Sequence, residues 1–249
     1  MKIGFFDSGL GGLLIMNAVA DALPYYDYEF YGDTANLPYG NKTEQEIFEL
    51  TKKGVEYLFK KDCVLIIIAC NTASAETLRK LQKEYLPNNY PDRKILGVII
   101  PTIEVLIEEK IQRAILIGTK RTIESNKYTI ELNKYPERID ITPIATPNLV
   151  ELIESRQNEI AFNEVCQIID SKAGEEAIIL GCTHYTILRE KLIEKYTVQG
   201  FKIIAQDTII PDKLKTYLEN HPEIENKLTR NNYRNIFLTR QIDDYLNLF

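Results

Sequence analysis

Residues 66–74, Ile-Ile-Ile-Ala-Cys-Asn-Thr-Ala-Ser, join a short apolar run to a polar stretch that begins a helical pattern. Such a run is typical of a strand buried on both faces of a parallel sheet. Its end brings one reactive side chain, Cys70, to the carboxyl edge of the sheet, where ligand sites of open α/β proteins lie. Residues 178–185, Ile-Ile-Leu-Gly-Cys-Thr-His-Tyr, repeat this pattern and carry Cys182 in the same place. Two thiols at the ends of two buried strands therefore need a common explanation.

The rest of the chain alternates apolar strand patterns with helical patterns. The expected strands besides these two lie at 2–6, 28–33, 94–99, 113–118, 140–145, 201–205 and 236–238. The expected helices lie at 13–23, 43–60, 74–85, 101–110, 158–171, 207–220 and, at the end, 241–248. Thr43 and Glu46 fit a capping box for the second of these helices. This alternation predicts an α/β fold with parallel sheets.

The strand pattern restarts in the middle of the chain. Thr119 follows a strand just as Asp7 does, and the offset between them equals the offset between Cys182 and Cys70. A shared offset suggests an internal duplication. We therefore expect two similar flavodoxin-like or Rossmann-like parallel-sheet domains, related by pseudo-twofold symmetry, with the active site in the cleft between them. The first would comprise residues 1–95 and 208–249, and the second residues 96–207.

Charge, hydropathy and cysteine content argue against several classes of protein. The 249 residues carry a formal net charge of −6, which argues against a general nucleic-acid binder. The sequence has neither an apolar stretch of transmembrane length nor a basic and apolar leader, so we expect a cytoplasmic protein without a membrane partner. It has four cysteines and no CxxC pair, so we expect neither structural disulfides nor a zinc ribbon, and no metal site.

Several chemistries could use the two thiols. We expect the helix that follows Cys70 to lower its pKa below the reference of about 8.5. Cys182 with His184 could form a hydrolase or acyl-transferase nucleophile, but this leaves the other thiol unexplained. A redox pair would require disulfide distance. Proton transfer on both faces of one carbon uses two thiols of equal standing. Cys63 and Cys166 fit ordinary core positions.

Taken together, these motifs resemble those of the glutamate racemases, a family within the cofactor-independent aspartate/glutamate racemase superfamily. The matching segments run in order through most of the chain, at 6–12, 32–33, 38–40, 69–73, 118–122, 148–151 and 180–185. The usual proline after the Cys-Thr-His-Tyr run is Thr186 in this sequence. This difference could alter the start of the following helix, but it does not touch the groups that would transfer protons.

The resemblance implies which residues act. Cys70 and Cys182 would be the catalytic acid/bases on opposite faces of the substrate Cα. Asp7 would lie beside the first thiol, and Glu151 and His184 beside the second. Substrate would be held by hydroxyl, amide and backbone groups, which suit two carboxylates and an ammonium. The implied substrate-binding residues are Asp7, Ser8, Tyr39, Gly40, Asn71, Thr72, Thr119, Thr122, Thr183 and His184.

The expected function is thus an isomerase that interconverts L- and D-glutamate without a cofactor and provides D-glutamate for peptidoglycan synthesis. No lysine motif suggests a pyridoxal Schiff base. The family is often dimeric, so a homodimer is expected. Aspartate racemase is the alternative within the class, although those relatives usually carry an acid at the position of His184. A noncatalytic amino-acid-binding protein of the same fold is the alternative outside it.

Overall fold

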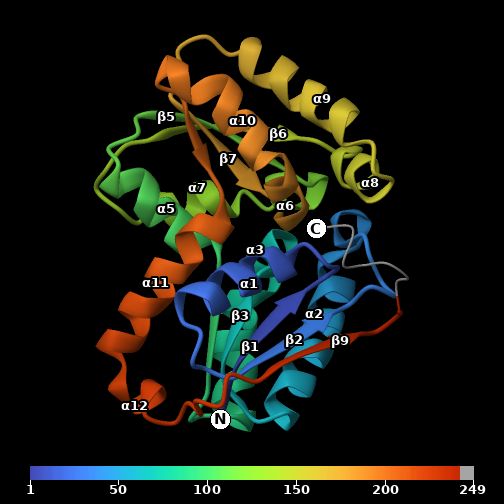
Figure 1. Cartoon of the computed structure of the whole chain (residues 1–249), viewed down its shortest axis with the longest axis vertical. Coiled ribbons are helices and arrows are strands. Elements are labelled where there is room, and N and C mark those ends of the chain that lie inside the picture. Colours follow the sequence, from blue (N-terminus) through green and yellow to red (C-terminus); the bar gives the residue numbers. More distant parts are fainter. Residues whose placement is uncertain (242–249) are drawn as a thin grey trace.

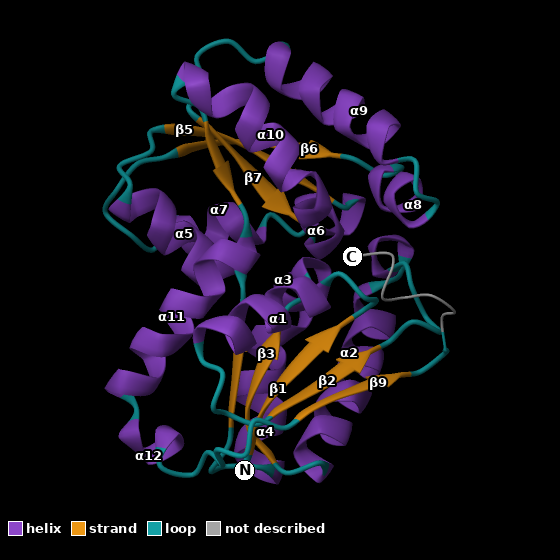
Figure 2. Cartoon of the chain, in the orientation of Figure 1, coloured by secondary structure: helices purple, strands orange, loops and turns teal. Residues whose placement is uncertain are grey.

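The computed structural model describes residues 1–241 of the chain, and the helix expected at 241–248 lies outside this described part except for its first residue. Figure 1 shows two lobes stacked along the longest axis of the molecule. Each lobe is built on its own parallel sheet, and helices cover both faces of each sheet (Figure 2). The α/β fold class with two parallel-sheet domains is therefore confirmed.

The first sheet has five parallel strands in the order β4-β3-β1-β2-β9. Its strands are β1 (Lys2–Asp7), β2 (Tyr28–Gly32), β3 (Cys63–Ile68), β4 (Lys94–Gly97) and β9 (Arg234–Leu238). All of β3 is buried, as expected for a continuous apolar run between two helical layers. The strand expected near the end of the sequence is β9, and it pairs with β2 at the edge of the sheet.

Two helical layers sandwich the first sheet. The layer on one face consists of α1 (Gly12–Ala22), α11 (Gln206–Asn220) and α12 (Pro222–Glu225). The layer on the other consists of α2 (Glu44–Lys60), α3 (Asn71–Lys80), the π-helical turn η2 (Leu81–Tyr85) and α4 (Leu86–Asn89). The expected capping box is present, since Thr43 and Glu46 each accept a hydrogen bond from the other's backbone N–H. It fixes the start of α2.

The second sheet has four parallel strands in the order β6-β5-β7-β8. They are β5 (Arg113–Gly118), β6 (Asp140–Ala145), β7 (Ala177–Gly181) and β8 (Lys202–Ile204). The helices of this lobe are, in chain order, α5 (Ile99–Glu108), α6 (Lys120–Glu124), α7 (Lys127–Leu132), α8 (Leu149–Glu154), α9 (Asn158–Asp170) and α10 (Arg189–Tyr196). Read from the other edge, the order β8-β7-β5-β6 repeats β4-β3-β1-β2 of the first sheet. The two lobes share one topology, as a duplication predicts.

Residues 1–241 cross between the lobes twice. It leaves the first sheet after β4 and enters α5, which packs against the second sheet. It returns after β8 through α11, whose apolar face packs with α1 on the first sheet. The crossings follow the ends of β4 at Gly97 and β8 at Ile204, and the domain bounds at residues 95 and 208 stay a prediction. Within residues 1–241, no helix combines the length and apolar character needed to cross a membrane.

Candidate active site

The two thiols stand at equivalent places in the two lobes. Cys70 directly follows β3 and is the N-cap of α3, where its sulfur accepts a hydrogen bond from the N–H of Ala73 at 3.4 Å. Cys182 directly follows β7 and precedes the 3₁₀ helix η3 (Thr183–Leu188). Both sulfurs line one cavity between the lobes, and both cysteines are free and buried. The structure thus brings together two side chains that are far apart in sequence.

The surroundings of Cys70 belong mostly to the first lobe. Its sulfur lies 3.2 Å from Ser8 Oγ. Burial, and then the nearby Asp7 carboxylate, raises the pKa of the Cys70 thiol to about 12, against the smaller opposing effect of the hydrogen bonds with Ser8 and Ala73. The expectation of a lowered pKa was therefore wrong, because burial in this cleft outweighs the helix N-terminus. Cys70 carries its proton at neutral pH.

Asp7 connects the two lobes. It ends β1 and is fully buried. One carboxylate oxygen accepts the Gly9 N–H at 3.1 Å, and the other accepts the Thr183 hydroxyl at 3.3 Å. Burial raises the pKa of Asp7, although the His184 charge and the Gly12 and Gly9 N–H groups act in the opposite sense. The charge of Asp7 thus acts on Cys70 of the first lobe. The same carboxylate accepts a hydrogen bond from Thr183, which follows Cys182 in the second lobe.

His184 lies between the second thiol and a carboxylate. Its Nδ1 is 3.7 Å from Cys182 Sγ, and its Nε2 is 3.0 Å from Glu154 Oε1. Burial acts to lower the pKa of His184, but hydrogen bonds with Cys182 and Glu154 outweigh it and raise that pKa well above 6.5. These contacts favour the protonated, positively charged form of the ring beside Cys182.

A carboxylate that the sequence analysis did not select lies at the His184 ring, and the role expected for Glu151 beside Cys182 stays a prediction. Both glutamates of α8 are exposed to solvent: Glu151 lies in its first turn, and Glu154 ends it and reaches the imidazole. Packing of α8 against η3 brings Glu154 to His184, and no local pattern in the sequence indicates this contact.

Most of the expected substrate-binding residues surround the same cavity. The expected residues that line it are Ser8, Tyr39, Gly40, Cys70, Asn71, Thr72, Thr119, Cys182, Thr183 and His184. Leu37, Pro38 and Val150 line it too, although sequence reasoning did not select them. Thr122 lies directly behind Thr72 and Thr119, and the three hydroxyls form a triangle with separations of 2.9, 3.0 and 3.1 Å. This triangle joins α3 of the first lobe to α6 of the second.

The loop after β2 closes the cavity from one side. Tyr39 is buried and donates its hydroxyl hydrogen to Asp33 Oδ2 at 2.6 Å, and burial followed by the Asp33 charge raises the pKa of Tyr39. At Gly40 this loop approaches the second lobe so closely that a Cβ would lie 2.8 Å from Thr119 Cβ. The cavity encloses only about 20 Å³. The lobes are thus closed on one another around the two thiols.

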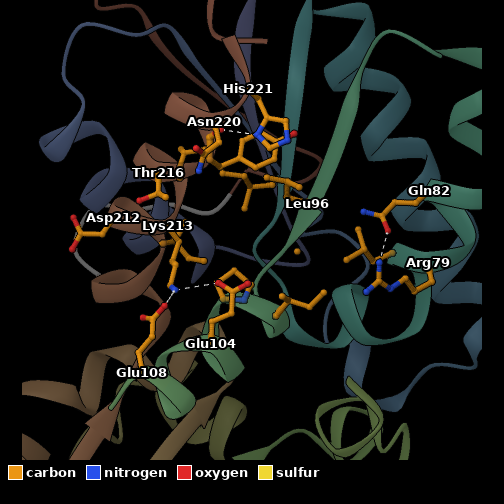
Figure 3. A pocket seen from close by; sticks show the side chains of 18 residues that line it. Arg79, Gln82, Leu96, Glu104, Glu108, Asp212, Lys213, Thr216, Asn220 and His221 are labelled. Atoms are coloured by element: carbon orange, nitrogen blue, oxygen red, sulfur yellow. Dashed lines mark hydrogen bonds and ion pairs between the residues drawn. The ribbon is translucent and has the colours of Figure 1, made fainter. Parts of the chain in front are cut away.

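A larger cavity of about 690 Å³ lies apart from the thiols (Figure 3). Side chains of α3, α5 and α11 line it, and Lys213 pairs there with Glu104 and Glu108. Neither Cys70 nor Cys182 lines this cavity, so it does not contain the candidate acid/base groups. Among the described residues, no three His, Cys, Asp or Glu side chains gather as a metal-binding cluster.

Comparison with known proteins agrees with this arrangement. The sequence profile of the family described as Asp/Glu/Hydantoin racemase matches residues 26–208. A glutamate racemase of Ruegeria pomeroyi is 33% identical over 239 residues, which cover 90% of this chain and 87% of the relative. The crystal structure of a glutamate racemase of Bacillus anthracis superposes with a TM-score of 0.84 at 29% identity, covering 97% of this chain and 89% of that one.

A second solved structure is that of the Francisella tularensis glutamate racemase in complex with D-glutamate. It superposes with a TM-score of 0.82 at 26% identity and covers 99% of this chain and 91% of its own. The similarity therefore extends over both lobes and over both strands that end in a thiol. The chain belongs to the Asp/Glu/hydantoin racemase family.

Proposed function

We propose that this chain acts as a glutamate racemase and interconverts L- and D-glutamate by proton transfer at Cα between Cys70 and Cys182. One observation carries the proposal: two buried thiols from equivalent strand ends of two similar lobes line a single cavity. Inversion of a stereocentre needs one group on each face of the carbon, and a duplicated fold supplies such a pair. The many glutamate racemases among its relatives support the choice of substrate.

The proposed reaction is balanced between the two sulfurs. The thiolate on one face takes the Cα proton, so that a Cα–H bond breaks and an S–H bond forms. The thiol on the other face gives its proton to Cα, so that an S–H bond breaks and the opposite enantiomer forms. The reverse reaction exchanges the two roles. Burial of both sulfurs strengthens the electrostatic interactions in the site.

Asp7 and His184 would set the protonation states of the two thiols. Asp7 lies close enough to Cys70 to influence its charge, and His184 Nδ1 faces Cys182. We propose that Glu154, in place of Glu151, accepts the His184 Nε2 hydrogen and keeps the imidazole turned toward Cys182. This pairing would also favour the imidazolium, and its positive charge would stabilise a carbanion-like transition state at Cα.

Hydroxyl and amide groups would hold the substrate. Thr72, Thr119 and Thr122 hydrogen-bond to one another across the lobes, and each hydroxyl could exchange such a bond for a carboxylate oxygen. Thr183 and Asn71 line the cavity as well. A set of several donors suits a substrate with two carboxylates. D-glutamate made here would be available for peptidoglycan synthesis, the role implied by the family resemblance.

We also propose that the enzyme works in the cytoplasm as a homodimer. Four free cysteines, two of them needed as thiols, suit a reducing compartment. The dimer rests on the family resemblance alone. Sedimentation equilibrium of the purified chain tests the dimer, and a constant monomer mass over a wide concentration range would contradict it. Fractionation of cells that express a tagged chain tests the compartment.

The proposed substrate is tested by incubating the protein separately with L-glutamate and L-aspartate, without added pyridoxal phosphate or metal. Chiral chromatography then measures each enantiomer over time. We expect D-glutamate to accumulate and D-aspartate to remain at background. D-aspartate alone would make the protein an aspartate racemase. If folded protein that binds glutamate produced neither D-amino acid, a noncatalytic binding protein would replace the proposal.

A further inference from the structure

Four polar side chains meet in the interior where the chain crosses between the lobes. They are Asn71 at the start of α3, Thr102 in α5, Tyr128 in α7 and Gln206 at the start of α11. All four are at most 2% exposed, and we call them the Asn71 network. Asn71 directly follows Cys70 and lines the active-site cavity. The network therefore connects the crossing between the lobes to the first thiol.

The hydrogen bonds of the network fix the orientation of the Gln206 amide. Thr102 donates its hydroxyl hydrogen to the Val98 carbonyl at 2.8 Å, so its oxygen can only accept from Gln206 Nε2, at 3.5 Å. Gln206 Nε2 also lies 3.2 Å from the Tyr128 hydroxyl. These two acceptors fix which way the Gln206 amide points. Its carbonyl oxygen is then free to accept from Asn71 Nδ2, at 3.1 Å.

The same bonds fix the Asn71 amide. Its Oδ1 accepts from the Tyr128 hydroxyl at 2.7 Å and faces Gln206 Nε2 at 3.3 Å. An inverted amide would place its N–H groups against the Gln206 N–H and would lose both bonds. An Asn side chain has two N–H hydrogens, and only one is used by Gln206. Among the described residues the other has no acceptor, and Asn71 lines the cavity that contains both thiols.

We propose that Gln206 and Tyr128 are positioning residues for the racemase reaction, which hold the Asn71 amide so that its remaining N–H donates to a substrate carboxylate beside Cys70. This inference rests on the proposed function, because it assigns a substrate contact in the same site. Asn71 and Cys70 belong to the first lobe, whereas Tyr128 belongs to the second. The amide therefore has its binding orientation only while the lobes keep this relative placement.

The test compares Tyr128→Phe and Gln206→Leu with the unmodified protein. Both variants remove a bond to Asn71 and leave the two thiols in place. Because a substrate contact of this kind is present in the ground state and the transition state alike, we expect KM for glutamate to rise roughly threefold to tenfold while kcat changes little. Tyr28→Phe is the matched control, since Tyr28 is fully buried and donates to the Leu23 carbonyl away from the cavity.

A double-mutant cycle separates positioning from a general effect on folding. If Gln206 and Tyr128 act through Asn71, then adding Tyr128→Phe to Asn71→Ala should leave KM unchanged from Asn71→Ala alone. The inference would be overturned if the KM increases of Asn71→Ala and Tyr128→Phe multiplied in the double variant. An unchanged KM in folded Tyr128→Phe would also overturn it. Tyr128→Phe is the mildest change, so it keeps the test decisive if Gln206→Leu does not fold.

Calorimetric titration with L-glutamate distinguishes failure of this inference from failure of the proposed function. If the unmodified protein binds glutamate without racemising it, the proposed function fails, and the same comparison is made on the dissociation constant. An equal dissociation constant in Tyr128→Phe and the unmodified protein would then overturn the inference alone. If the unmodified protein neither binds nor racemises glutamate, both fall together.

Discussion

The two thiols have equivalent places in the fold but different neighbours. Cys70 contacts the Ser8 hydroxyl and lies near the Asp7 carboxylate, and its pKa is raised to about 12. Cys182 instead faces His184, whose pKa is raised well above 6.5. The surroundings of Cys70 thus favour its neutral thiol, and the contacts of His184 favour a protonated imidazole beside Cys182. At the scale of single residues, the two lobes therefore place their thiols at equivalent backbone positions but surround them with different side chains.

The first prediction concerns the carboxylate at His184. Glu154→Gln should lower kcat roughly tenfold, because the imidazole loses a charged hydrogen-bond partner. Glu151→Gln is the matched control on the same helix and should have a smaller effect, since it leaves the hydrogen bond between Glu154 and His184 in place. Initial rates in both directions provide the measurement. A larger loss in Glu151→Gln than in Glu154→Gln would contradict the placement of Glu154.

The second prediction concerns the pH dependence of stability. His184 has a folded pKa above its ordinary 6.5. Its protonation therefore stabilises the fold fully below about pH 6.5 and loses this effect as pH rises through the folded pKa. We expect the difference in free energy of unfolding between the unmodified protein and His184→Gln to shrink from pH 6 to pH 9. Denaturant titrations at each pH measure it, and a difference that grows with pH would refute the proposed charge.

At the scale of elements, α1 of the first lobe meets η3 of the second through glycine. A Cβ built on Gly11 would lie 2.6 Å from Thr183 Oγ1 and 2.8 Å from the backbone nitrogen of His184. Only a residue without a side chain permits this approach. The contact brings Asp7, at the end of β1, within reach of the Thr183 hydroxyl.

The third prediction follows from this contact. Gly11→Ala should force α1 and η3 apart and lower the free energy of unfolding by about 1–3 kcal/mol. It should also reduce kcat/KM more than a substitution on the surface of α1 does. Asn17→Ala, on the exposed side of α1, is the control and should change neither quantity appreciably. Chemical denaturation and initial rates measure both. Near-normal activity and stability in Gly11→Ala would show that the two elements do not need this close approach.

The sequence predicts elements better than it predicts their environments. Apolar runs, the Thr43 capping box and the repeated strand-thiol pattern depend on neighbouring residues in the chain, and the structure has them where expected. The raised pKa of Cys70 and the choice of Glu154 over Glu151 depend on burial and on packing between distant segments. The Asn71 network joins four separate helices, so no local pattern indicates it.

At the scale of the whole molecule, the two lobes enclose the site almost completely. The cavity of about 20 Å³ holds little more than one water, which needs about 10–15 Å³. Glutamate needs more room than one water, so we expect the lobes or the loop at 34–42 to move to admit it. Within residues 1–241 the chain crosses between the lobes only after β4 and after β8, so we expect such a movement to occur at these crossings.

The fourth prediction concerns this opening. Saturating L-glutamate should slow amide hydrogen exchange in the loop at 34–42 and at the start of α3, since bound substrate holds the lobes together. Helix α9 lies on the outer side of the second lobe and serves as an internal control (Figure 1). Exchange that stays the same in the loop and at α3, under conditions where calorimetry shows binding, would contradict closure of the lobes on the substrate.

The central claim is that two thiols act on opposite faces of one carbon, and deuterium incorporation tests it most directly. The protein is incubated with L-glutamate in D₂O, and both enantiomers are recovered at low conversion. The account predicts solvent deuterium at Cα of the newly formed D-glutamate and almost none in the remaining L-glutamate, because the proton leaves to one sulfur and arrives from the other. Equal deuterium in both enantiomers from the start would indicate a single exchanging base and would contradict the two-thiol mechanism.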